Sequence, residues 1–285
     1  TCLAETEAKR GLLRNARRHV DIAKRGLSGF SNPWVEALAE NVEFAIETMR
    51  SDFGSALKHA RKCLELADQA GAANIHVSAL GNLGNLSFLA SQLDEATNCL
   101  SRVSAAARKG SDNWVGAVDT LARIYLAQGH LADCAKLLDE IDDVAALNDR
   151  SRYAYRHTQL TRVHLLARLD KLDDALRHTD FILTLANRSG DHLLNDLALL
   201  TKAELLQQAQ RTPESVSLLR ALVSAIPDQS PDYFAQYERT LACAMARSGE
   251  LELAEQHRKR AERIYAGLGH QAGQLDQIPR QIDDL

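Results

Sequence analysis

The sequence is poor in residues that break helices or cross-link a chain. Among its 285 residues there are five prolines, fifteen glycines and five cysteines, and 5% are aromatic. Ala, Leu, Arg, Glu and Gln dominate instead, and all of them favour helices. Because helix formers are abundant and interrupting residues are scarce, the composition predicts an all-α fold.

The cysteines argue against two kinds of cross-linked site. They are odd in number, lie far apart and contain no CxxC pair, so neither a disulfide framework nor a zinc site is indicated. We interpret them as small buried hydrophobic residues; they are Cys2, Cys63, Cys99, Cys134 and Cys243.

Long apolar runs and an excess of basic residues are missing as well. No run of eighteen apolar residues is present, and the start TCLAETEAKR does not have the layout of a signal peptide, so we expect a cytoplasmic chain without membrane contact. The net charge of −4 and the scattered Lys and Arg predict no direct nucleic-acid contact by this segment. The first residue is Thr and not Met, which suggests a fragment of a larger protein.

Signatures of catalysis and of cofactor binding are also absent. The sequence contains no P-loop, no GxGxxG, no GxSxG elbow, no HExxH and no recognisable helix-turn-helix. Of the ten histidines, the nearest pair with helical spacing is His157 and His164, which are too far apart along a helix to chelate one ion. The sequence therefore predicts a non-enzyme with no catalytic residue, no cofactor and no metal.

What the sequence does contain is a repeat of about 40 residues. The clearest units run over residues 79–103, 119–141 and 239–261. Aligning the small residue that follows each turn gives spacings of 40, 40, 38, 41, 40 and 39 residues between Ala16, Ala56, Ala96, Cys134, Ala175, Ser215 and Ala254. This period predicts an α-solenoid of about seven helix pairs that covers residues 1–285 as a single domain.

Two further columns agree with this alignment. Five residues before the anchors the sequence has mostly turn formers, namely Gly11, Ser51, Ser91, Gly129, Asp170, Gln210 and Gly249. Twelve residues before them most residues are small, as a close crossing of two helices requires; this column holds Phe44, Gly84, Ala122, Val163, Ala203 and Ala242. The columns predict fourteen antiparallel helices of about 12–18 residues each.

Capping residues mark the starts of several first helices. Ser31-Asn32-Pro33 and Ser230-Pro231 place a capping side chain before Pro, and Ser111 offers a cap alone. Trp34 and Trp114 follow two of these caps at similar places in the repeat. They would serve either as aromatic anchors for a ligand or as packing residues at the junctions between repeats, and we favour packing because aromatic residues bury a large area.

At this point the residues resemble the tetratricopeptide repeat (TPR) family over nearly the whole chain. The stretches ending at Ala96 and starting at Leu121 carry the likeness best, whereas the first two units and the one around Ser215 are degenerate. The long period looks most like the sensor domains of bacterial MalT-type LuxR or sigma-54-dependent transcriptional regulators. The resemblance implies a right-handed superhelix that binds a ligand and does not catalyse a reaction.

The resemblance also implies that the first helix of each pair lines a concave groove. Carried onto this sequence, the groove residues are Asn82, Asn85, Asp119, Thr120, Arg123, His157, Thr161, His164, Arg168, Thr201, Glu204, Gln207, Arg239, Thr240 and Arg247. Four arginines in this set outnumber its two carboxylates, so the groove is expected to prefer an anionic ligand. The threonines at one repeat position suggest a row of hydrogen-bonding groups.

Two functions fit this reading. The first is a sensor or interaction module of a bacterial regulator, with a peptide, a protein segment or a small anionic effector in the groove. The alternative is a stand-alone scaffold for protein assembly, and an unrecognised enzyme is a distant third. The sequence leaves the ligand and the oligomeric state open.

Overall fold

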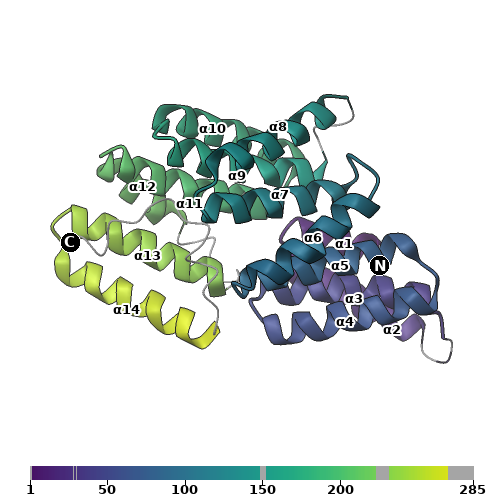
Figure 1. Cartoon of the computed structure of the whole chain (residues 1–285). Coiled ribbons are helices and arrows are strands. Elements are labelled where there is room, and N and C mark those ends of the chain that lie inside the picture. The colour runs from purple at the N-terminus through teal and green to yellow at the C-terminus, as the bar shows by residue number, and fades with distance from the viewer. Residues whose placement is uncertain (1, 28, 30, 148–151, 223–230, 269–285) are drawn as a thin grey trace.

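The computed structural model describes residues 2–27, 29, 31–147, 152–222 and 231–268. Within these ranges the chain forms fourteen α-helices and no strand, which confirms the predicted all-α solenoid (Figure 1). In chain order they are α1 (Cys2–Lys9), α2 (Leu13–Gly26), α3 (Pro33–Met49), α4 (Phe53–Gln69), α5 (Ala73–Leu89), α6 (Leu93–Ala106), α7 (Asp112–Ala127), α8 (Leu131–Leu147), α9 (Tyr153–Arg168), α10 (Leu172–Ser189), α11 (His192–Gln208), α12 (Thr212–Leu222), α13 (Pro231–Arg247) and α14 (Leu251–Leu268).

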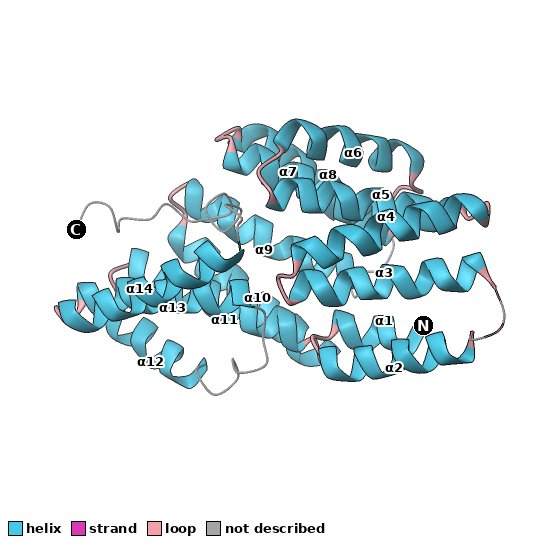
Figure 2. Ribbon diagram, turned by 90° about the horizontal axis from the view of Figure 1, so that it is seen from below, coloured by secondary structure: helices cyan, strands magenta, loops and turns pink. Residues whose placement is uncertain are grey.

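The helices stack as successive antiparallel pairs. The pairs α3–α4, α5–α6 and α13–α14 make extensive contacts, and each second helix also contacts the first helix of the next pair. The first helices α3, α5, α7, α9, α11 and α13 contact one another in turn, so they form a continuous inner layer (Figure 2). This layer carries the candidate site described below.

The seven predicted turn positions are confirmed by their backbone conformation. Gly11, Gly129 and Gly249 have φ of 79°, 80° and 82°, and φ lies between 59° and 61° at the four other turn residues, Ser51, Ser91, Asp170 and Gln210. In this left-handed conformation the chain ends one helix and redirects its amides to the last carbonyls of that helix. The first helices α1, α3, α5, α7, α9, α11 and α13 therefore all end by the same device.

The anchor column lies in the close-packed interface between paired helices. Six of the seven anchors are completely buried, and the seventh, Ala254, is 8% exposed. A tight helix crossing is at Gly84 in α5, twelve residues before the anchor Ala96, where an added Cβ would lie 2.8 Å from Leu100 Cγ in α6. A larger side chain has no room at Gly84, which explains why most residues in the column twelve positions before the anchors are small.

Most of the predicted caps are found, and one of the two tryptophans departs from its interpretation. The side chains of Asn32 and Ser111 accept hydrogen bonds from the backbone N–H groups of Val35 and Trp114, both at 3.3 Å, whereas Ser230 lies outside the described residues. Trp114 is buried at 5% exposure, as expected for a packing residue, but Trp34 is 53% exposed. Trp34 stands in the first turn of α3, where about half of the residue is exposed to solvent.

Three further expectations need correction. Cys2 is exposed at the start of α1, so it is not a buried hydrophobic residue, whereas Cys63 and Cys134 are buried and Cys99 and Cys243 are partly buried. Helix α1 has eight residues, fewer than the expected 12–18. Helix α12 has eleven residues, and the residues that follow Leu222 lie outside the described ranges.

The superhelix brings its first turn against a much later one. Arg10 Nε, next to the α1–α2 turn, donates a hydrogen bond of 3.1 Å to the carbonyl of Gly190 in the α10–α11 turn. A Cβ on Gly11 would lie 3.3 Å from Leu193 Cβ at the start of α11. Contacts therefore skip several repeats, and the inner layer curves around an interior space. Among the described helices, none is long and apolar enough to cross a lipid bilayer.

Candidate functional site: a cavity on the inner helical layer

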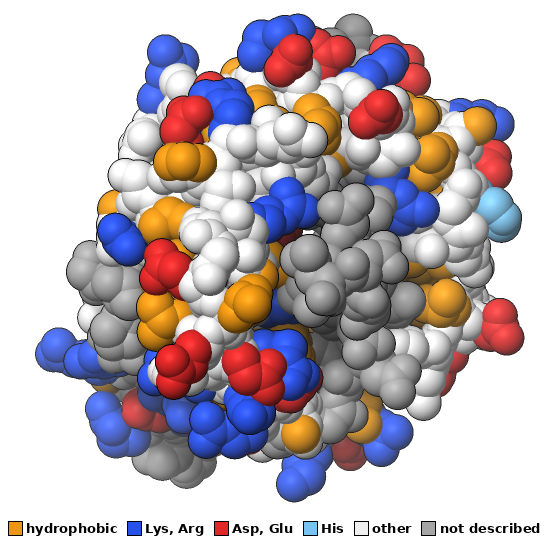
Figure 3. All heavy atoms as spheres, turned by 90° about the vertical axis from the view of Figure 1, so that its left-hand side faces the viewer, with side chains coloured by type: hydrophobic (Ala, Val, Ile, Leu, Met, Phe, Trp, Pro, Cys, Tyr) orange, Lys and Arg blue, Asp and Glu red, His pale blue; other side chains and the backbone are white. Residues whose placement is uncertain are grey.

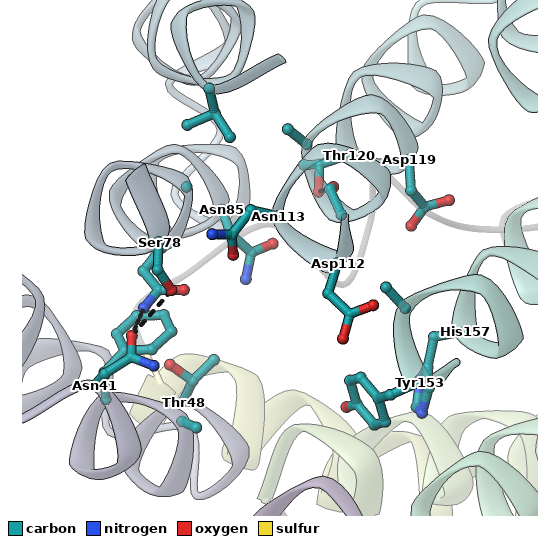
Figure 4. Close-up of a pocket in the computed structure, with 18 of the residues that line it drawn as sticks. Asn41, Thr48, Ser78, Asn85, Asp112, Asn113, Asp119, Thr120, Tyr153 and His157 are labelled. Atoms are coloured by element: carbon teal, nitrogen blue, oxygen red, sulfur yellow. Dashed lines mark hydrogen bonds between the residues drawn. The ribbon is translucent and has the colours of Figure 1, made fainter. Parts of the chain in front are cut away.

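A cavity of about 380 Å³ opens on the inner layer. Five successive first helices, α1, α3, α5, α7 and α9, line it, and the second helix α6 contributes Leu100 and Val103 (Figure 4). Its polar lining residues include Glu5, Asn41, Thr48, Ser78, Asn82, Asn85, Asp112, Asn113, Asp119, Thr120, Tyr153 and His157, and apolar side chains such as Val42, Phe44, Met49 and Val77 lie between them. Such a mixture of apolar surface and convergent polar groups is typical of ligand sites.

One part of the cavity, between α3, α5 and α7, is rich in amides and hydroxyls. Asn41 Oδ1 accepts hydrogen bonds from Asn82 Nδ2 at 2.8 Å and from Ser78 Oγ at 3.3 Å, which fixes the orientation of the Asn41 amide. Asn85 and Asn113 come close together between α5 and α7 (Figure 4). Neither of these two side chains has a hydrogen-bond partner among the described residues. Both amides are available to a ligand.

The other part, between α7 and α9, is acidic and aromatic. Asp112 and Asp119 lie on the side of α7 that faces Tyr153 and His157 of α9 (Figure 4). Arg152 Nε binds Asp112 Oδ1 at 2.9 Å, and the rings of Tyr153 and His157 lie 4.3 Å apart between centroids. The two parts together present distinct chemistry at the two ends of one cavity.

Two buried oxygen atoms in the lining have no hydrogen-bond partner, Thr48 Oγ1 and Asp119 Oδ1. Burial raises the pKa of Asp119 by more than Arg123, Thr161 and His157 lower it. Buried polar atoms are nearly always hydrogen-bonded in folded proteins, so orphaned ones in a cavity point to a ligand or to bound water.

His157 connects the cavity to the α10–α11 turn. Its Nε2 lies 3.2 Å from Asp191 Oδ2, which also accepts a hydrogen bond of 3.0 Å from Arg156. Asp191 Oδ1 caps α11 through the backbone N–H of Leu194 at 3.1 Å. Burial alone would raise the pKa of Asp191, but the hydrogen bonds from these partners and the charge of His157 lower it.

The structure brings only some of the predicted groove residues together at the cavity, namely Asn82, Asn85, Asp119, Thr120 and His157. The row of threonines is buried between helices. The hydroxyls of Thr120 and Thr201 donate to a carbonyl one turn earlier in their own helix, both at 2.9 Å. The hydroxyl of Thr240 lies 2.8 Å from Gln236 O and 2.9 Å from Glu204 Oε1 and shares its one hydrogen between them. Thr161 is buried beside Asp119.

The remaining predicted residues lie outside the cavity lining, and several are bound to other protein groups. Glu204 Oε1 accepts hydrogen bonds from Arg239 at 3.3 Å and from Thr240 at 2.9 Å. Gln207 Nε2 donates to Thr240 O at 3.0 Å, and Arg247 donates to the carbonyl of Gln207. The guanidinium of Arg123 lies 4.7 Å from the centroid of the Phe88 ring, and the half-buried Arg168 is the last residue of α9. None of the described residues that line the cavity is an Arg or a Lys.

The N-terminal part of the site was not predicted from the sequence. Asn41, Thr48, Ser78 and Glu5 line the cavity; Glu5, Asn41 and Thr48 belong to the two degenerate first repeats, and Ser78 belongs to the third repeat. The same offsets from the anchors reach these residues: Asn41 precedes Ala56 by the same fifteen residues that separate Asp119 from Cys134. Applying the repeat register to every unit would have identified them.

One group of side chains has the geometry of metal ligands but is balanced by cations. The nearest ligand atoms of Glu43, Glu47 and His59 lie within 4.8 Å of one another. Arg17 forms ion pairs with both glutamates, and Lys24 Nζ lies 3.1 Å from Glu43 Oε1. These two cations already neutralise the carboxylates, so the group does not favour a metal ion.

His164 is not placed to share an ion with His157. Burial lowers the pKa of His164 to about 4, so its imidazole is neutral at physiological pH, and its Nδ1 is buried without a hydrogen-bond partner. His157 is instead held by Asp191. Burial also raises the pKa of Cys63 and of Cys134 to about 12, so both thiols stay protonated at neutral pH.

The outer surface differs from the cavity in its charge pattern. On the face shown in Figure 3, Lys and Arg side chains lie beside Asp and Glu side chains. Mixed charge of this kind is ordinary for a soluble surface. The local excess of carboxylates therefore distinguishes the cavity lining from this face.

No protein-family profile and no curated protein sequence matches the chain, but solved structures share its fold. A Rap protein in complex with the Competence and Sporulation Factor superposes with a TM-score of 0.69 at 14% identity, over 93% of this chain and 73% of that protein. A tetratricopeptide repeat protein from Parabacteroides merdae gives a TM-score of 0.54 at 15% identity, over 93% and 94% of the two chains.

A third similar structure is a signal transduction ATPase with numerous domains, which carries a tetratricopeptide repeat sensor and comes from Pyrococcus horikoshii. It gives a TM-score of 0.60 at 13% identity, over 91% of this chain and 40% of that one. The chain thus has the fold of tetratricopeptide repeat proteins, as the repeat columns predicted.

Proposed function

We propose that this segment is a non-catalytic binding module that holds an extended peptide or protein segment in the cavity on its inner layer. The observation that carries the proposal is the convergence of five first helices on one cavity whose lining contains unpaired amides. Amides such as Asn85 and Asn113 both donate and accept hydrogen bonds, so they suit a peptide backbone, which carries both kinds of group in alternation. Apolar residues between them suit side chains of the ligand.

The wider role that we propose is the sensor or interaction module of a cytoplasmic bacterial transcriptional or signalling regulator. The fold supports this role, since one similar structure is described as a tetratricopeptide repeat sensor joined to an ATPase. The alternative is a stand-alone scaffold. The adjoining coding sequence separates the two: an ATPase or helix-turn-helix module supports the regulator, and a start codon just upstream with no further domain supports the scaffold.

The anionic effector expected from the sequence remains a prediction for the C-terminal part of the wall only. Arg168, Arg239 and Arg247 lie there, outside the cavity. Two of them already contact Glu204 or a backbone carbonyl, so the peptide in the cavity is the function that the geometry favours.

Blocking the cavity tests the proposal. An added Cβ on Gly116 of α7 would meet no atom within 4 Å, and Gly116 lines the cavity, so the side chain in Gly116→Leu projects into it. Gly26→Leu at the end of α2 is the matched control, because a Cβ there also meets nothing and the residue lies outside the lining. Peptides selected from a random library on the wild-type protein should bind Gly116→Leu at least about tenfold more weakly and Gly26→Leu unchanged. Equal binding to all three proteins would contradict the proposal.

A further inference from the structure

We infer that the acidic end of the cavity binds a cationic ammonium group of the ligand, with Asp119 as its main contact. This inference rests on the proposed peptide-binding function and names the chemistry that the site selects. It replaces, for the cavity, the anionic preference that the arginine count suggested.

The first observation is the charge of the lining. Three carboxylates, those of Glu5, Asp112 and Asp119, line the cavity, and its lining contains no Lys or Arg. His157 is the basic side chain among the described lining residues, and its Nε2 lies 3.2 Å from Asp191 Oδ2. Carboxylates therefore outnumber basic groups among the described lining residues, although Arg152 pairs with Asp112 from outside the lining.

The second observation is one unpaired oxygen of the Asp119 carboxylate, which also has a hydrogen bond from Thr161. Asp119 Oδ1 is buried and has no hydrogen-bond partner, whereas Asp112 Oδ1 is bound by Arg152. A buried carboxylate is costly without a donor or an opposite charge, and an ammonium group supplies both. Asp119 is thus the carboxylate whose environment a cationic ligand would complete.

Arg123 is the internal group that would compete with such a ligand. It lies within electrostatic range of Asp119, but its guanidinium is placed over the Phe88 ring at 4.7 Å. The balance of burial and these charges still raises the pKa of Asp119, so Arg123 does not fully compensate the carboxylate.

The aromatic residues beside Asp119 fit a cation as well. Tyr153 lines the cavity at the same end, with its ring 4.3 Å from that of His157. The face of an aromatic ring attracts an ammonium group, most strongly where water is excluded; the guanidinium of Arg156 already lies 6.0 Å from the centroid of the Tyr153 ring, so Tyr153 is a secondary contact beside Asp119. The amide end of the cavity would then hold the backbone that follows the ammonium group, which fixes the direction of the peptide.

An ammonium group has two sources in a peptide, the N-terminus and a lysine side chain, and the test distinguishes them. Three pools of random octapeptides with amidated C-termini are applied to the wild-type protein, and the retained peptides are identified by mass spectrometry. One pool has free N-termini and no Lys or Arg, the second has acetylated N-termini and includes Lys, and the third has acetylated N-termini and neither Lys nor Arg.

We expect retention of the first or second pool to exceed that of the third by about tenfold or more, as for a hydrogen bond between charged groups. Asp119→Asn, which keeps the shape and removes the charge, should abolish this preference while the third pool is retained as before. Its melting temperature should equal or exceed that of the wild type, because the variant no longer buries a carboxylate. Asn85→Ala is the control, and it should weaken the retention of all pools alike.

Two results would overturn the inference. Equal retention of the three pools by the wild type would show peptide binding without selection for a cation, so the proposed function would stand alone. A preference for cationic peptides that survives in Asp119→Asn would show that another group contacts the cation, and Glu5→Gln would be the next variant to measure. Retention of no pool would reject the peptide function itself.

Discussion

At the residue scale, the most informative position is the turn between the two helices of a pair. Seven sequence positions with seven different surroundings adopt the same left-handed conformation, although only three of them are glycine. A residue with a Cβ pays about 1 kcal/mol or more for this conformation. Repeat geometry, and not the local residue type, therefore determines the backbone at these turns.

This cost leads to a stability prediction. Gln210 has φ of 59° in the α11–α12 turn, so Gln210→Gly should stabilise the protein by roughly 0.5–1 kcal/mol. The midpoint of urea unfolding measures the change. Gln256→Gly is the matched control, since Gln256 is exposed within α14 and glycine inside a helix costs about 1 kcal/mol. If both variants are destabilised to the same extent, the conformation of Gln210 is not left-handed in solution.

At the element scale, the helix-interior glycines Gly84 and Gly116 have opposite surroundings. Both lie within first helices, where Ala in place of Gly normally stabilises a helix by about 1 kcal/mol. A Cβ on Gly84 would lie 2.8 Å from Leu100 Cγ and 3.1 Å from Cys99 Cβ, whereas a Cβ on Gly116 meets nothing. At Gly84, close packing therefore opposes the gain in helix propensity, whereas at Gly116 helix propensity acts without a packing penalty.

We predict that Gly84→Ala destabilises the protein by about 1–2 kcal/mol, because overpacking a tight crossing outweighs the gain in helix propensity. Gly116→Ala should stabilise it by about 0.5–1 kcal/mol. Thermal and urea unfolding of both variants, measured side by side, give the sign of each change. A stabilised Gly84→Ala would mean that α5 and α6 are farther apart than the structure places them.

The same comparison shows what could be predicted from the sequence. Turns, anchors and crossings recur with the repeat period because each helix pair must end, cross and stack in the same way, so the columns predicted all three. The polar groups of the site do not recur in this way: Thr120 and Thr201 share a column but donate to their own helices, whereas Asn85 shares a column with Arg123 and yet faces the cavity. Their roles depend on the curvature of the superhelix, which the repeat pattern does not specify.

At the scale of the whole molecule, that curvature makes the solenoid more than a linear stack. In a one-dimensional array each repeat contacts only its neighbours. Here Arg10 joins the first turn to Gly190, 180 residues later, and Glu5 and Ala8 of α1 line the same cavity as His157 of α9. His157 in turn contacts Asp191, which caps α11 next to Gly190. The α10–α11 turn thus contacts both Arg10 of the first turn and His157 of the cavity wall.

The hydrogen bond from Arg10 to Gly190 should therefore stabilise the first repeat in addition to the contacts with its neighbouring repeat. Helix α1 has eight residues, too few to be stable alone. Arg10→Ala removes the hydrogen bond to Gly190 and should cost about 1 kcal/mol, with faster amide hydrogen exchange confined to α1, α2 and the α10–α11 turn. Arg18→Ala, an exposed change on α2, is the control and should leave exchange unchanged.

Because α1 carries part of the cavity wall, peptides bound by the wild type should also bind Arg10→Ala more weakly. Exchange in α1 that is identical in Arg10→Ala and the wild type would show that neighbouring repeats alone hold the first helix in place.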